Sequence, residues 1–282
     1  MFDKVTIIGV GLIGGSVGLA IKKNKLARKV VGLSHRQASL TKAQSLGAID
    51  EGFTEVAAAV RGADLVIIAT PVEWIIKMFP QINTHLKKNC IITDVGGTKV
   101  EIIAAAQNAL ANPVNFVGSH PLAGSEKKGV EFASVDLFQN ALCIMTPLKT
   151  THQSAREKVK TLWTKMGCRV KLMTPEEHDE ILGFVSHMPH IVAYSMVESI
   201  PESFLLYAPK GLKDTTRIAA SDPELWKDVC LTNSRYVIKS IDAVTKSLSQ
   251  IRKAIIDRED KTLLDHFTKS KAKRESFPES AA

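Results

Sequence analysis

The sequence lacks any long apolar segment. None of the uninterrupted apolar runs in its 282 residues reaches the roughly 20 residues that a membrane-spanning helix needs. Residues 1–20 have no basic leading segment, and glycines and serines interrupt their apolar stretch, so we expect no signal peptide. Apolar residues make up 45% of the chain and charged residues 23%, which is typical of soluble globular proteins. We therefore expect no association with membranes.

Cysteine is scarce as well. The chain holds four cysteines, and no two of them form a Cys-x-x-Cys pair. Scattered cysteines are typical of reduced thiols in cytoplasmic proteins rather than of disulfide frameworks or metal sites. We therefore expect a cytoplasmic protein without a bound metal. The four are Cys90, Cys143, Cys168 and Cys230.

Aromatic residues amount to only 6% of the chain, although its net charge is +8 from 37 basic and 29 acidic residues. A nucleic-acid surface would interleave basic and aromatic residues on one face. Part of the positive charge lies instead in the polar C-terminal segment, at Lys269, Lys271, Lys273 and Arg274. The charge balance therefore indicates attraction for small anionic ligands and no nucleic-acid partner.

A glycine-rich turn near the N-terminus carries the strongest functional signal. The β-branched run Val5–Ile8 leads directly into Gly9-x-Gly11-x-x-Gly14, and a helical pattern follows. This is the dinucleotide-binding fingerprint, in which the pyrophosphate lies on a helix N-terminus. Gly9 permits the tight turn, Gly11 lets the phosphates approach the backbone, and Gly14 lets the helix pack on the strand. The residues expected to bind the cofactor here are Gly9, Gly11, Leu12, Ile13 and Gly14.

Short apolar runs alternate with helical patterns through residues 1–173. Continuous apolar strands separated by helices predict a parallel sheet that is covered on both faces. We therefore expect an α/β fold, a Rossmann-type doubly wound parallel sheet, as the dinucleotide-binding domain. The expected strands are 5–8, 30–33, 65–69, 90–93, 114–117, 142–145 and 170–172, and the expected helices are 12–23, 36–46, 72–85, 99–110 and 152–165.

The pattern changes at Thr174-Pro175-Glu176-Glu177, which is typical of a capped helix start. From there to residue 267 we find only helical periodicity. We therefore expect an all-helical C-terminal domain over 174–267 that binds substrate and forms a homodimer, although its apolar helix faces can equally pack within one chain. Residues 268–282 are expected to be a polar, frayed tail.

The second expected strand indicates which nicotinamide cofactor binds. An NAD site usually has a carboxylate at the end of this strand, for the ribose 2′-hydroxyl. This chain has Ser34, His35 and Arg36 there. Because serine and arginine can bind a 2′-phosphate that a carboxylate would repel, we predict that NADP is preferred over NAD. The alternative is that Arg36 merely begins the next helix and that both cofactors bind.

Three segments follow expected strands at the edge where the nicotinamide must lie: 69–72, 94–99 and 118–126. Thr70 and Pro71 in the first are candidate cofactor contacts. Lys99 in the second either contacts the cofactor or orders its own loop. His120 in the third is the candidate catalytic base, because histidine titrates near working pH.

The helical segment supplies a second polar set. His187 and His190 are three residues apart and therefore share a helix face, and His178 is near them in sequence. Arg217 is of the residue type that best binds carboxylates, with an ion pair as the alternative. Because no third ligand of suitable type is evident, we expect a polar substrate pocket and no metal. Its candidate residues are His178, Ser186, His187, His190 and Arg217.

Taken together, these segments resemble the prephenate/arogenate dehydrogenase family of tyrosine biosynthesis over nearly the whole chain. The resemblance rests on Gly9-x-Gly11-Leu12-Ile13-Gly14-Gly15-Ser16, Gly118-Ser119-His120-Pro121-x-Ala123-Gly124, Thr174-Pro175-x-x-His178-Asp179, Ser186-His187-x-Pro189-His190 and Lys213-Asp214-x-Thr216-Arg217-Ile218-Ala219, followed by Ser221-Asp222-Pro223-x-x-Trp226.

The resemblance implies oxidative decarboxylation of prephenate to 4-hydroxyphenylpyruvate. His120 would accept the hydroxyl proton, Arg217 would grip a carboxylate, and His190 would lie near the substrate side chain. The last of these favours prephenate over arogenate, and tyrosine is expected to inhibit at the active site. Relatives commonly have a serine near the catalytic histidine where this chain has Gly97, so Thr98 or a water replaces that contact, or it is absent. The alternatives are a β-hydroxyacid or imine reductase and an NADP-sensing module without turnover.

Overall fold

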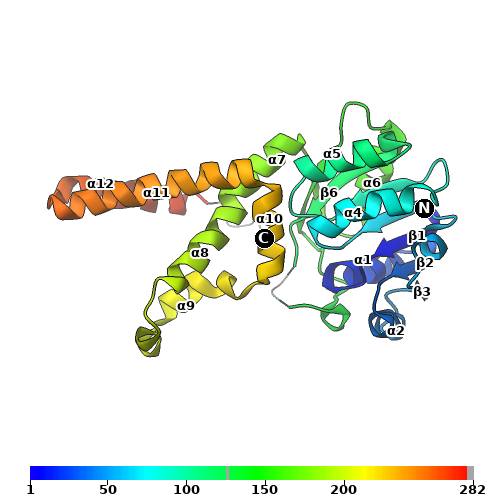
Figure 1. Cartoon of the computed structure of the whole chain (residues 1–282), viewed down its shortest axis with the longest axis horizontal. Helices are drawn as coiled ribbons and strands as arrows, with labels where there is room; N and C mark the ends of the chain where they lie inside the picture. The colour runs from blue at the N-terminus through cyan, green and yellow to red at the C-terminus, as the bar shows by residue number, and fades with distance from the viewer. Residues whose placement is uncertain (125–126, 278–282) are drawn as a thin grey trace.

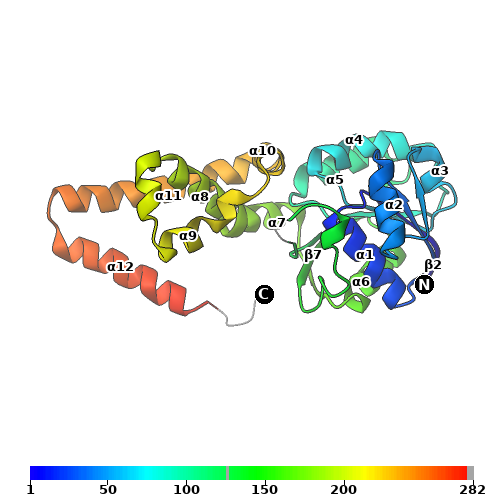
Figure 2. The ribbon, with the colours of Figure 1, turned by 90° about the horizontal axis from the view of Figure 1, so that it is seen from below.

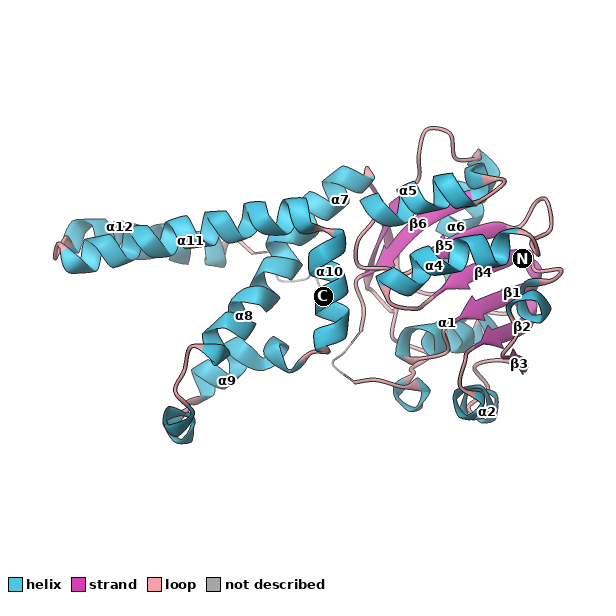
Figure 3. Ribbon diagram, in the orientation of Figure 1, coloured by secondary structure: helices cyan, strands magenta, loops and turns pink. Residues whose placement is uncertain are grey.

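The computed structural model describes residues 1–124 and 127–277. Its N-terminal part is built on one eight-stranded sheet in the order β3-β2-β1-β4-β5-β6-β7-β8 (Figure 3). The predicted α/β Rossmann-type fold is confirmed, with the qualification that β7 runs antiparallel to β6. The strands are β1 (Phe2–Ile8), β2 (Ala27–Leu33), β3 (Glu51–Phe53), β4 (Leu65–Ile68), β5 (Ile91–Asp94), β6 (Phe116–Pro121), β7 (Leu142–Thr146) and β8 (Arg169–Leu172).

Helices cover both faces of this sheet. In Figure 2, α4 and α5 lie on one side of it, and α1 and α6 lie on the other. Each side has its own apolar core, one centred on Trp163 and Ile21 and the other on Phe79 and Ile102. The helices are α1 (Leu12–Lys23), α2 (Gln37–Ser45), α3 (Val56–Val60), α4 (Val72–Asn83), α5 (Val100–Ala109) and α6 (Gln153–Lys165).

Two short elements, β3 and α3, were absent from the sequence prediction. β3 has three residues, Glu51-Gly52-Phe53, which form no apolar run of their own. It pairs with β2 at the sheet edge, so that tertiary pairing rather than local sequence makes it a strand. The strand β6 also extends further than predicted and includes His120.

The rest of the chain is helical and projects away from the sheet (Figure 1). Thr174 Oγ1 accepts a hydrogen bond from the Glu177 backbone N–H at 3.1 Å, and the Glu177 carboxylate accepts one from the Thr174 N–H at 2.8 Å. This is the capping box that the sequence predicts. The helices are α7 (Pro175–Leu182), α8 (Met188–Glu198), α9 (Lys210–Thr216), α10 (Pro223–Thr232), α11 (Ser234–Ile256) and α12 (Asp260–Glu275), with a π-helical segment, η3 (Gly183–His187), between α7 and α8.

The C-terminal segment differs from the expected frayed tail. The helix α12 continues to Glu275, because its last turns remain hydrogen-bonded and Ser276 closes them on Ala272. Figure 2 shows α12 folding back beside α11. Residues 278–282 of the predicted tail lie outside the described residues. Among the helices described, none is both long and apolar enough to cross a membrane.

Candidate active site

The glycines of the fingerprint form an open cradle at the N-terminus of α1. Gly9 has a φ of 90°, and a Cβ on it would lie 2.7 Å from the Ala69 carbonyl oxygen. A Cβ on Gly14 would lie 1.9 Å from the Gly9 carbonyl oxygen, whereas a Cβ on Gly11 would meet no atom within 4 Å. The turn is therefore packed tightly beneath and open at Gly11, which fits a dinucleotide pyrophosphate. Leu12 and Ile13 begin α1 at this opening.

The other candidate cofactor residues lie at the same edge of the sheet. Ser34 directly follows β2, and its hydroxyl accepts the Arg36 backbone N–H at 3.2 Å. The Arg36 guanidinium donates to His35 Nε2 at 3.1 Å, and both side chains are exposed. Thr70 packs against Gly9, and its buried Oγ1 has no hydrogen-bond partner among the described residues. An unpaired buried hydroxyl beside the cradle fits contact with a cofactor, and Pro71 follows it at the start of α4.

Lys99 does not lie on this open edge, because its side chain is fully buried. Its ammonium pairs with the Asp94 carboxylate and donates to the Ser119 carbonyl oxygen at 2.9 Å. The other Asp94 oxygen accepts the Ser119 backbone N–H at 3.0 Å. Of the two roles predicted for Lys99, the structure favours ordering of its loop over contact with the cofactor.

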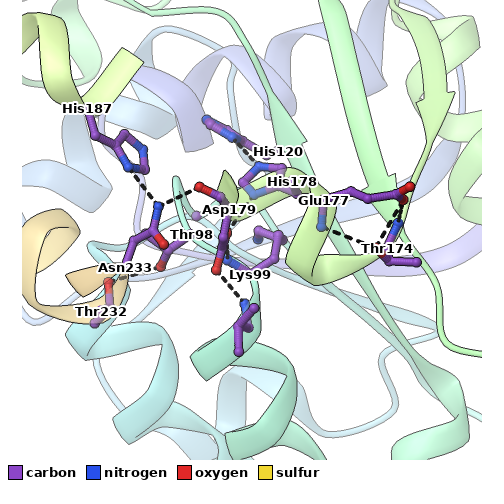
Figure 4. A network of polar contacts seen from close by, with 12 residues as sticks. Thr98, Lys99, His120, Thr174, Glu177, His178, Asp179, His187, Thr232 and Asn233 are labelled. Atoms are coloured by element: carbon purple, nitrogen blue, oxygen red, sulfur yellow. Dashed lines mark hydrogen bonds and ion pairs between the residues drawn. The ribbon is translucent and has the colours of Figure 1, made fainter. Parts of the chain in front are cut away.

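His120 lies near the end of β6, partly buried, and is held by a neighbour from the helical part. Its Nδ1 is 2.9 Å from His178 Nε2, and His178 Nδ1 is 2.7 Å from Asp179 Oδ1 (Figure 4). Asp179 in turn accepts the backbone N–H groups of Lys99 at 2.7 Å and Val100 at 2.9 Å. The prediction that His178 lines the substrate pocket is therefore corrected. His178 is fully buried, and it contacts His120 and Asp179.

His187 is likewise a buried connection. Asn233 donates from its amide nitrogen to His187 Nδ1 at 3.0 Å and to the Asp179 carbonyl oxygen at 2.8 Å. Because His187 is 2% exposed, the predicted substrate contact of this residue is corrected to a buried contact with Asn233. Thr98 does not reach His120 either, since its hydroxyl bonds that of Thr232 at 3.0 Å.

The remaining candidates surround the π-helical segment. Pro189 has no N–H to donate and cannot continue a regular α-helix ladder, which accounts for an interruption here. The Ser186 carbonyl oxygen accepts a hydrogen bond from His190 Nδ1 at 2.9 Å. The indole of Trp226 stacks on the His190 ring at a centroid distance of 3.6 Å. His190 is partly buried, and Arg217, at the start of η5 (Arg217–Ala220), is exposed.

Burial keeps the histidines of this cluster neutral. It lowers the pKa of His120 well below the usual value, and the neighbouring His178 and Lys99 act in the same direction. Burial also lowers the pKa of His178 to about 2 and that of His187 to about 4. The pKa of His190 is lowered by burial and by the charge of Arg217, against the bond to Ser186. At neutral pH the site therefore offers unprotonated imidazoles.

The sequence did not assign roles to Asp94, Asp179, Trp226 or Asn233. Asp179 and Trp226 stand within recognisable motifs, and the position of Asp179 directly after His178 was a signal that the pair acts together. Asp94 ends an apolar strand, where a carboxylate is unusual. Nothing in the sequence marks Asn233. The segment 118–126 ends at Ser125 and Glu126, which lie outside the described residues.

Comparison with known proteins agrees with this arrangement. Residues 17–172 match the family of the prephenate dehydrogenase nucleotide-binding domain, and residues 174–269 match that of the prephenate dehydrogenase dimerization domain. The chain is 36% identical to prephenate dehydrogenase of Bacillus subtilis, covering 99% of this chain and 77% of that protein. It is 33% identical to cyclohexadienyl dehydrogenase of Zymomonas mobilis, covering 97% and 96%. A crystal structure of prephenate dehydrogenase from A. aeolicus with hydroxyphenyl propionate and NAD+ superposes with a TM-score of 0.91, at 34% identity and 98% coverage of both chains.

Proposed function

The chain belongs to the prephenate dehydrogenase family of NAD-dependent dehydrogenases, and we propose that it converts prephenate to 4-hydroxyphenylpyruvate by oxidative decarboxylation. When bound, the nicotinamide ring supplies the acceptor for the hydride that leaves the hydroxyl-bearing carbon. Loss of CO2 then makes the ring aromatic. The observation that carries the proposal is the position of His120 near the end of β6, at the sheet edge where the cradle opens, with its Nδ1 held by His178.

His120 is the proposed catalytic base. Oxidation of an alcohol requires removal of the hydroxyl proton while hydride departs, and a neutral imidazole can accept that proton. Burial holds the pKa of His120 low, so that its basic form predominates at neutral pH. With Nδ1 directed at His178, the proton from the substrate hydroxyl goes to Nε2.

Arg217 and His190 are the proposed substrate-binding residues. A guanidinium binds a carboxylate through two parallel hydrogen bonds, and Arg217 is close enough for its charge to lower the pKa of His190. His190 is held by Ser186 and Trp226, so that its Nε2 edge is directed by two independent contacts. Two acidic groups on prephenate suit this basic surface better than the zwitterionic side chain of arogenate, which is the alternative substrate.

For the cofactor, NAD binding is a property of the family, and we propose that this chain prefers NADP. Ser34 and Arg36 support this preference, because a hydroxyl and an exposed guanidinium stand at the end of β2 where a carboxylate would select NAD. We also propose a cytoplasmic homodimer that tyrosine inhibits at the active site. The four free cysteines, three of them buried, suit a reducing compartment.

Turnover measurements test the proposal in four combinations: prephenate or arogenate, each with NAD+ or NADP+. We expect the highest kcat/KM for prephenate with NADP+. A strong NAD+ preference would contradict the cofactor proposal, and no turnover in any combination would overturn the function.

Variants at His120 test the base. We expect His120→Ala and His120→Asn to lower kcat by about 10²–10⁴. The exposed His85→Gln serves as the matched control and should retain the wild-type rate. Near-normal turnover in both His120 variants would remove His120 as the base.

A further inference from the structure

We propose that His178 and Asp179 are positioning residues that fix the tautomer of His120, so that its Nε2 is always the proton acceptor. The proposal rests on the proposed role of His120 as the base. It assigns His178 and Asp179 to the orientation of His120 rather than to contact with substrate.

The chain of hydrogen bonds begins at the N-terminus of α5. Lys99 is the N-cap and Val100 the first residue of this helix, and their N–H groups donate to opposite oxygens of the Asp179 carboxylate. Burial raises the pKa of Asp179, but two backbone donors and the positive end of the helix act against this and favour a carboxylate that only accepts. His178 Nδ1, at 2.7 Å from Asp179 Oδ1, must therefore be the donor of that bond.

The direction of the first bond determines the second. A neutral imidazole carries one proton, so that His178 with a proton on Nδ1 presents a lone pair at Nε2. His120 Nδ1 lies 2.9 Å from this lone pair and must carry the proton of the bond between them. His120 Nε2 is then left unprotonated, as a base requires.

The same chain responds when His120 becomes charged. The substrate O–H bond breaks, an N–H bond forms at Nε2, and the imidazolium keeps Nδ1–H directed at His178. Lys99 and His187 also face His120, and Lys99 disfavours that positive charge. His178 is also among the groups that lower the pKa of His120, but its Nε2 lone pair, with the Asp179 carboxylate behind it, accepts the Nδ1–H of the charged ring.

In the 94–99 segment, neither Gly97 nor Thr98 makes the hydrogen bond to His120 that His178 makes. Gly97 has no side chain, and the Thr98 hydroxyl bonds Thr232. A Cβ on Gly97 would meet only Val229 Cγ2, at 3.7 Å. Among the described contacts, the Thr98 hydroxyl bonds Thr232 and not His120, and His178 is the residue that contacts His120 Nδ1.

The decisive variant is Asp179→Leu in the full-length protein, which removes the acceptor of the His178 Nδ1–H group and of the Lys99 and Val100 N–H groups. The His178 proton is then no longer fixed on Nδ1, and the His120 tautomers mix. We expect kcat to fall by about 10²–10⁴ while the KM for prephenate changes by less than about threefold. Glu176→Gln, which removes an exposed carboxylate on α7, is the matched control.

The tautomer itself is measured by ¹⁵N NMR of histidine-labelled protein with NADP+ bound, with the His120 signals assigned from His120→Ala. We expect Nδ1–H in the wild-type protein and in Glu176→Gln, and a mixture of the two tautomers in Asp179→Leu. An unchanged tautomer in Asp179→Leu, or an unchanged kcat, would overturn the proposal.

The tautomer measurement separates the proposed role of His120 as base from the proposed positioning role of His178 and Asp179. Normal turnover in His120→Ala would end the role of His120 as base, whereas the tautomer measurement would still test the chain from Asp179. If Asp179→Leu does not fold, His178→Phe decides, because it keeps an aromatic ring and removes the acceptor. We expect the His120 tautomers to mix and kcat to fall in His178→Phe, and a retained Nδ1–H form with wild-type kcat would contradict the inference.

Discussion

The three glycines of the fingerprint are needed for different steric reasons, although they belong to one motif. Gly9 needs its positive φ and Gly14 needs close backbone contact, whereas Gly11 needs only open space above it. The sequence motif predicted the tight turn at Gly9 and the close packing at Gly14, because both depend on local geometry, and the approach of phosphates at Gly11 stays a prediction. It did not reveal that Lys99, His178 and His187 are buried, because that depends on which surfaces the helical segment covers.

This difference predicts that alanine at Gly14 lowers the stability of the fold, whereas alanine at Gly11 weakens binding of the dinucleotide. Gly14→Ala places Cβ against backbone that cannot move aside, and we expect it to lower the free energy of unfolding by about 1–3 kcal/mol. Gly11→Ala meets no protein atom, so that stability should remain within about 1 kcal/mol of wild type. We expect the KM for the dinucleotide to rise about tenfold in Gly11→Ala, as for one lost hydrogen bond. Denaturant unfolding and steady-state kinetics measure both, and equal destabilisation by the two variants would contradict the geometry.

His187 predicts how stability depends on pH. Its folded-state pKa of about 4 is below the ordinary value of 6.5. The unfolded chain therefore takes up a proton at His187 between pH 6.5 and 4 while the folded protein does not, and stability falls as the pH falls through this window. This pKa difference lowers the free energy of unfolding by about 3 kcal/mol at pH 4.

Urea unfolding at a series of pH values checks this expectation. In His187→Gln the slope of unfolding free energy against pH should become shallower between pH 4 and 6.5. His85→Gln, at an exposed histidine, should keep the wild-type slope. If His187→Gln kept the wild-type slope, burial of His187 would not be the cause of the loss of stability at low pH.

At the scale of elements, prediction succeeded where sequence pattern and burial coincide. The strands β1, β4 and β5 are continuous apolar runs in the middle of the sheet, and they occur where the pattern indicated. The edge strand β3 has no such run. The π-helical segment η3 was also not predicted, since Pro189 signals an interruption but not its form. Yet this segment contains Ser186, whose carbonyl oxygen holds His190.

At the scale of the whole molecule, α11 and α12 leave large apolar side chains in solvent. Leu264 is 66% exposed, and Leu248, Ile255 and Phe267 are similarly uncovered. Exposed apolar side chains along two neighbouring helices indicate a surface that another chain covers, in keeping with the dimerization domain that this region matches.

We therefore expect the protein to be a dimer and the double variant Leu264→Glu/Phe267→Glu to be a monomer, because charges would be buried at the interface. Light scattering after size exclusion measures the mass. Lys269→Glu, an exposed polar site on the same helix, should remain dimeric. A monomeric wild-type protein would exclude this role for the surface.

The hydrogen bonds that support His120 have a consequence for how the two halves of the chain evolve. His120, the proposed base, stands on a strand of the nucleotide-binding half, but the hydrogen bonds that hold it come from His178, Asp179 and Asn233 in the helical half. Recombination that exchanged one half for that of a distant dehydrogenase would preserve a cradle for the dinucleotide and leave the histidine without its partner. The two halves must therefore be inherited as one unit, even though each has its own pattern of secondary structure.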